Sequence, residues 1–110
     1  MTYDKLKQKL ENYNWDDGFK VPCQLLSDAN CDLALALEIF YLGDGYTYLI
    51  SRELQAKYQE EWLEFIDRLY YDIVAGKYPK TEHPYQIPLT KVQRYQLEKT
   101  NTAKIFLTDL

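Results

Sequence analysis

The segment that most constrains the fold is Leu33–Leu42, LALALEIFYL, in which Glu38 is the only charged residue. Its alanines and leucines favour helix, and it has almost no β-branched residues. Asp32 can cap the first turn, and Gly43 suits the position just after a helix end. Ten helical residues span only about 15 Å and are marginally stable alone. We therefore expect a central helix that is packed by neighbours on most sides.

Three rows of side chains run along this helix at helical spacing, and only one of them carries polar groups. The rows are Leu33, Leu37 and Phe40; Leu35, Ile39 and Leu42; and Ala34, Glu38 and Tyr41. We predict that the third row forms a rim facing water. A lone buried carboxylate is costly, so Glu38 either lies at this rim or anchors an internal hydrogen bond or a partner's cation.

Four further helices are predicted from amphipathic spacing and capping residues. They cover residues 3–13 after Thr2, residues from about 20 to 28 with Pro22 in the first turn, residues 52–75 between Ser51 and Gly76, and residues 91–99 after the capping box of Thr90 and Gln93. On the long helix 52–75, Arg68 has i,i+4 partners in Glu64 and Asp72, which indicates a solvated charged face. The resulting fold class is all-α: one domain over residues 1–110, a compact bundle of about five helices around 33–42.

Three segments between and after these helices are less clearly defined. Residues 46–50 are β-prone but also compatible with an irregular turn of helix, and we favour a turn because one short strand cannot form a sheet. Residues 77–89 contain three prolines and are predicted to be an extended surface connection. The tail 103–110 is apolar enough to dock on the body, as helix or as extended chain.

Charge is unevenly distributed along a chain whose formal net charge is −4. Residues 11–51 contain seven acidic residues and one lysine, and no Lys or Arg occurs between Val21 and Ser51. Phosphate binding needs Lys and Arg, so this distribution argues against nucleic acid and favours a basic partner. The chain also has 11 tyrosines, a residue type that suits interfaces.

The cysteines and the hydropathy pattern indicate a soluble, cytoplasmic protein. Cys23 and Cys31 lie in apolar contexts and match no metal spacing, so we expect two free buried thiols in a reducing compartment. No apolar run approaches the roughly 18 residues of a membrane span, and the first residues lack a signal-peptide core.

No catalytic or metal-binding constellation is evident. The acidic turns at Asp16-Asp17-Gly18 and Asp44-Gly45 lack the alternating ligands of a calcium loop. His83, the only histidine, has no nucleophile nearby in sequence and is expected to be exposed beside Pro84. We therefore predict no enzyme activity and no cofactor or metal.

The motif NWDDGF, then Pro22, then NCDLALALEIFYLGDG resembles a family of small, mostly bacterial proteins known only as a domain of unknown function. The resemblance covers residues 14–48 best and implies an all-helical domain without established enzyme activity. It also implies, for some members, a role as immunity proteins encoded beside polymorphic toxins.

Charge, tyrosine content and this resemblance together predict an immunity protein that binds and neutralises a cognate toxin domain, possibly a basic nuclease. The alternative is a peptide-binding adaptor with a groove between the central and long helices. A monomer or weak homodimer is expected. The predicted partner-binding residues are Asp16, Asp17, Asp28, Glu38, Tyr41, Asp44, Tyr46 and Tyr48.

Overall fold

Helix α3, Leu33–Leu42, lies at the centre of the computed structural model, which describes residues 1–50 and 60–110. Its N-cap is Asp32, whose Oδ1 accepts a hydrogen bond from the Leu35 N–H at 2.9 Å. Seven of its ten residues are buried. The predicted central helix is therefore confirmed with its bounds and its cap.

The described residues contain six α-helices, two short 3-10 helices and no strand, which confirms the all-α class. The elements are α1 Tyr3–Glu11, η1 Trp15–Asp17, α2 Lys20–Leu26, α3, α4 Gly45–Ile50, α6 Glu60–Val74, α7 Lys91–Lys99 and η2 Lys104–Phe106. Helix α6 lies within the predicted long helix 52–75 and confirms that prediction for residues 60–74. The predicted cap Ser51 and the residues up to 59 lie outside the described part of the chain.

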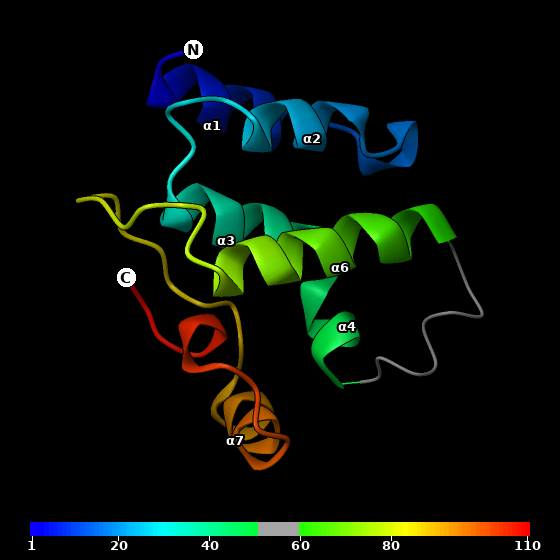
Figure 1. Cartoon of the computed structure of the whole chain (residues 1–110), viewed down its shortest axis with the longest axis vertical. Helices are drawn as coiled ribbons and strands as arrows, with labels where there is room; N and C mark the ends of the chain where they lie inside the picture. The colour runs from blue at the N-terminus through cyan, green and yellow to red at the C-terminus, as the bar shows by residue number, and fades with distance from the viewer. Residues whose placement is uncertain (51–59) are drawn as a thin grey trace.

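Helices α3 and α6 run side by side through the middle of the molecule, and the other elements cover them (Figure 1). Helices α1 and α2 lie together on one side of this pair, and α4, α7 and η2 lie on the other. Phe106 of η2 is fully buried, with its ring 4.8 Å from that of Phe40 and stacked on that of Tyr70 at 5.0 Å. The C-terminal tail thus docks on the body as predicted, through a 3-10 turn.

Local signals placed most helix ends correctly. The Thr90 hydroxyl accepts from the Gln93 N–H while the Gln93 side chain accepts from the Thr90 N–H, so both bonds of the predicted capping box are present. Gly76 has φ +80°, as expected just after α6. Residues 46–50, for which a turn was favoured over a strand, belong to the short helix α4.

Two predictions about α3 are wrong at its ends. Ala34, assigned to the water-facing rim, is buried, and Leu42, assigned to a core row, is 52% exposed. The Leu33 N–H donates to the Pro79 carbonyl at 2.9 Å, so the segment 77–89 crosses the first turn of α3. Leu42 lies in the last turn, where the chain leaves for α4. The spacing of residues within one helix cannot predict that a distant segment covers its first turn or that the chain turns away at its last.

The two cysteines differ in exposure. Cys31 is buried as predicted, but Cys23 is exposed on the short helix α2, and both thiols are free. No described helix has the length and hydropathy needed to cross a membrane.

Candidate functional site

Two of the predicted partner-binding acids are paired inside the domain. Asp28 Oδ2 lies 3.0 Å from the N-terminal amine, and the Asn30 N–H together with this amine holds the pKa of Asp28 below its usual value. Glu38 lies at the rim of α3 and accepts two hydrogen bonds from Lys7 Nζ, at 2.7 and 2.8 Å. The charge of Asp28 is therefore compensated by the amine of Met1, and the charge of Glu38 is compensated by Lys7 of α1.

The predicted tyrosines face the protein more than the solvent. Tyr41 is half-buried and donates its hydroxyl to the Phe106 carbonyl, and burial raises the pKa of this hydroxyl. Tyr46 is half-buried against the core. Tyr48 is only 2% exposed, so almost none of its side chain is available to contact a partner. The three rings pack against the hydrophobic core, and α4, which carries Tyr46 and Tyr48, packs against α6.

The remaining predicted acids, Asp16, Asp17 and Asp44, are exposed at one end of the molecule. Trp15 of η1 packs by its ring edge against Phe65 of α6, with ring centroids 6.4 Å apart. The Trp62 Nε1–H of α6 donates to the Gly43 carbonyl at 2.6 Å. Element η1, the α3–α4 turn and the beginning of described α6 therefore meet.

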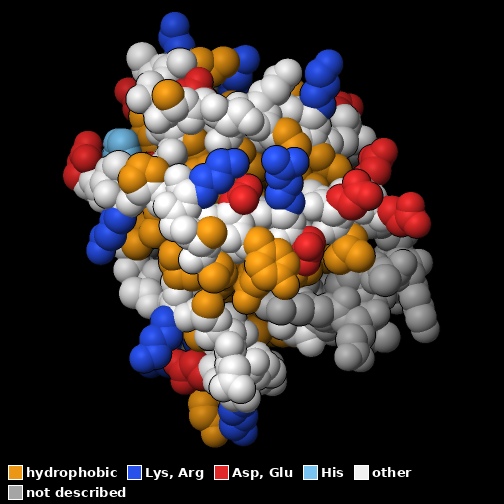
Figure 2. Space-filling view, viewed as in Figure 1, with side chains coloured by type: hydrophobic (Ala, Val, Ile, Leu, Met, Phe, Trp, Pro, Cys, Tyr) orange, Lys and Arg blue, Asp and Glu red, His pale blue; other side chains and the backbone are white. Residues whose placement is uncertain are grey.

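Helix α6 brings three further exposed acids to this end. We use the name acidic end for Asp16, Asp17, Asp44, Glu60, Glu61 and Glu64. Acidic side chains gather on the side of the molecule where described α6 begins, while Lys and Arg lie farther along this face (Figure 2). The contribution of α6 was not predicted from sequence, because charged residues along one helix side indicate a solvated face and not which other elements lie beside it.

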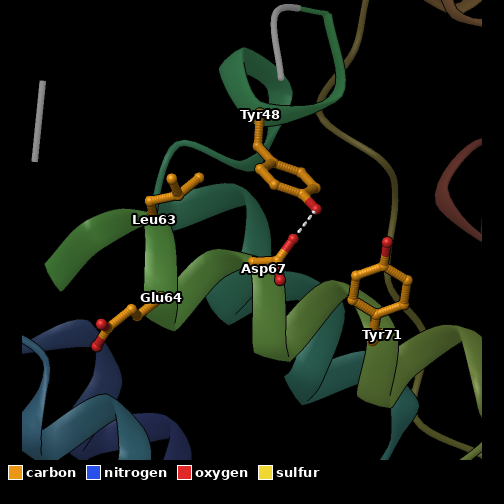
Figure 3. A pocket seen from close by; sticks show the side chains of 5 residues that line it. All are labelled: Tyr48, Leu63, Glu64, Asp67 and Tyr71. Atoms are coloured by element: carbon orange, nitrogen blue, oxygen red, sulfur yellow. Dashed lines mark hydrogen bonds between the residues drawn. The ribbon is translucent and has the colours of Figure 1, made fainter. Parts of the chain in front are cut away.

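A pocket of about 380 Å³ adjoins the acidic end between α4 and α6. It is lined by Tyr48, Leu63, Glu64, Asp67 and Tyr71. The Tyr48 hydroxyl donates to Asp67 Oδ1 at 2.5 Å (Figure 3). The same view shows Glu64 pointing away from these two side chains, toward the N-terminal helices drawn in blue. Tyr71 is 56% exposed and offers contact area on the Asp67 side of the pocket. This arrangement suits a cationic group with an apolar stem.

A second polar cluster lies at the other end of α3 and contains His83, which was predicted to be exposed but is half-buried. Asp32 Oδ2 lies 2.6 Å from His83 Nδ1 and accepts from the Thr81 hydroxyl at 2.6 Å. The Tyr3 ring stacks on the His83 ring with centroids 3.5 Å apart. No group of three or more His, Cys, Asp or Glu that could hold a metal occurs among the described residues. The cluster ties the segment 77–89 to α1 and α3.

Taken together, fold and surface define a small all-helical domain with an acidic end and an adjoining aromatic pocket. The chain belongs to the family described as a domain of unknown function, DUF4274, whose model matches residues 3–74. The matched range includes the NWDDGF motif and all of α3. No curated protein and no solved structure matches the chain.

Proposed function

We propose that this domain is an immunity protein that binds a cognate bacterial toxin domain in the cytoplasm and covers its active or substrate-binding surface. The observation that carries the proposal is the acidic end, where η1, the α3–α4 turn and α6 bring six exposed carboxylates together. A nuclease toxin holds phosphates with Lys and Arg, and these cations are the natural complement of such a surface. The resemblance of the NWDDGF segment to immunity-associated proteins supports the same function.

Charge and apolar contact have different roles in this proposal. Charged surfaces that complement each other mainly accelerate association, whereas desolvated aromatic contacts slow dissociation. The acidic end supplies the charge. Tyr71 and Leu63, at the pocket beside it, supply apolar surface. Of the predicted contacts, Asp16, Asp17 and Asp44 remain in this proposed surface, and Tyr48 instead supports the pocket from the core.

A peptide-binding adaptor remains the second candidate, because the pocket between α4 and α6 can receive a side chain of a bound peptide. The groove first expected for it, between the central and long helices, is filled: α3 and α6 pack together, and Leu35, Ile39 and Ile66 are fully buried. An adaptor would use the pocket with several partners, whereas an immunity protein has one.

Affinity purification of the tagged domain from its native host at low salt tests the proposal. One stoichiometric partner, a basic toxin domain, is expected. The double variant Asp16→Lys with Asp44→Lys should slow association with this toxin by about tenfold or more at low salt, and less at high salt. The matched control reverses two exposed acids elsewhere, Asp4→Lys with Glu98→Lys. Equal association rates for wild type and the first variant would refute the role of the acidic end, and several unrelated partners would favour the adaptor.

A further inference from the structure

A separate cavity of about 160 Å³ lies between α2, α6 and the beginning of the segment 77–89. It shares no lining residue with the pocket at the acidic end. Its lining residues are Cys23, Leu26, Ser27, Phe65, Arg68, Leu69, Asp72, Lys77 and Tyr78. Apolar side chains from α2 and α6 therefore form one part of the wall, and a mixture of cationic and hydroxyl groups forms another.

Arg68 is the cation of this cavity that has no ion pair in the described part of the chain. The sequence predicted partners for it in Glu64 and Asp72. Within residues 1–50 and 60–110, Glu64 forms no ion pair, and Asp72 pairs with Lys77 Nζ at 3.4 Å instead of with Arg68. The Arg68 guanidinium, for which the helical spacing predicted carboxylate partners, is thus available to an anion at the cavity.

Tyr78 supplies a second unused group. The residue is only 7% exposed, and its hydroxyl makes no hydrogen bond with any other described residue. Burial raises the pKa of this hydroxyl, and the nearby Arg68 charge opposes the shift, so the group is a protonated donor close to the guanidinium. None of the described side chains has a fully buried polar atom without a hydrogen-bond partner, so the Tyr78 hydroxyl reaches the open space of the cavity, where a ligand oxygen can accept its hydrogen bond.

We propose that this cavity binds a small monocarboxylate with a short apolar body. The Arg68 guanidinium and the Tyr78 hydroxyl hold the carboxylate, and Leu26, Phe65 and Leu69 contact the apolar body. A planar guanidinium matches the two oxygens of a carboxylate better than a point charge does. Asp72 also lines the cavity and disfavours a second negative charge, which argues against phosphate.

The size of the cavity restricts the ligand to a small molecule. A water molecule occupies about 30 Å³ of liquid, so the cavity accommodates a body of only a few such volumes. Benzoate is a suitable probe because it combines one carboxylate with a compact apolar ring. Benzamide, which has the same shape without the charge, is its matched control. The site is distinct from the acidic end and does not depend on the identity of a protein partner.

The test is a titration of the isotope-labelled full chain with benzoate, followed by the amide resonances of the protein. We expect saturable shifts at Ser27, Leu69 and Tyr78, and binding of benzamide that is about tenfold weaker. Arg68→Gln should weaken benzoate binding by about tenfold or more, and Tyr78→Phe by several-fold. Lys104→Gln, a change of an exposed cation outside the cavity, should have no effect.

Two outcomes would overturn the proposal. One is the absence of saturable shifts with benzoate, and the other is an equal response of wild type and Arg68→Gln. Arg68 is exposed, so its replacement leaves the fold intact and the comparison interpretable. If Tyr78→Phe fails to fold, the benzoate affinities of Arg68→Gln and Lys104→Gln still decide whether the cavity binds the carboxylate through Arg68.

Discussion

Replacing Asp32 by alanine should destabilise the domain far more than the loss of an ordinary helix cap. The carboxylate is only 3% exposed and accepts three hydrogen bonds. Loss of the cap on α3 costs about 1 kcal/mol. The bonds from Thr81 and His83 each contribute about 1 kcal/mol net, because both donors can turn to water once the carboxylate is gone. The total is about 3 kcal/mol.

This cost is a large fraction of the stability of a small domain, which is about 5–15 kcal/mol. For a chain of 110 residues it corresponds to a fall in Tm of about 12 °C. Asp32→Asn should cost about 2 kcal/mol, since one oxygen can still cap α3 while the amide nitrogen accepts nothing. Urea unfolding followed by circular dichroism measures both values.

A double-mutant cycle with Thr81→Val separates the cap from the cluster. The coupling energy between positions 32 and 81 should be about 1 kcal/mol, because the two side chains share a hydrogen bond. If Asp32→Ala cost only about 1 kcal/mol and its effect added to that of Thr81→Val, the carboxylate would act as a cap alone, and the reasoning would be refuted.

Three further predictions concern packing and ionisation. Gly45→Ala should lower the free energy of unfolding by more than about 3 kcal/mol, because the new Cβ would overlap the buried Phe40 ring and approach the Phe40 carbonyl oxygen to 2.6 Å. A urea midpoint equal to that of the wild type would contradict this prediction. Iodoacetamide should label Cys23 in the native state and Cys31 only after unfolding, as peptide mass spectrometry would show; equal rates would contradict the burial. Burial raises the pKa values of the Cys31 thiol and the Tyr3 hydroxyl to about 12. The unfolded chain releases these two protons at lower pH than the folded chain, so the stability they contribute should be fully present below about pH 9 and fall as pH rises toward 12. A Tm that did not change between about pH 9 and 12 would refute this pH dependence.

The central helix could be predicted from sequence because its determinants are local. The cap Asp32, the apolar run and the break at Gly43 lie within a few residues of one another. The capping box at Thr90 is local in the same way. Such signals depend on backbone hydrogen bonds between close neighbours, so they need no knowledge of the tertiary fold.

The candidate surface could be predicted only in part, because exposure and charge compensation are tertiary properties. Asp28 and Glu38 are acidic in sequence, but the N-terminal amine and Lys7 neutralise them through contacts 27 and 31 residues away in the chain. Arg68 shows the reverse case, since the partner expected for it four residues on is taken by Lys77. Helical spacing states which pairs can form, and the path of the chain decides which do.

The same argument explains why the cluster at His83 was missed and why it matters for the architecture. Asp32 and His83 are 51 residues apart, and only the path of the segment 77–89 across α3 brings them together. The family match ends at residue 74, whereas Phe106 and His83 lie beyond it. Phe106 fills the core beside Phe40, and His83 hydrogen-bonds the buried carboxylate of Asp32, which lies inside the matched range. The residues after the family match therefore add apolar contacts to the core and hydrogen bonds to polar groups of the matched helices. The fold of residues 3–74 is thus stabilised by the segment that follows it.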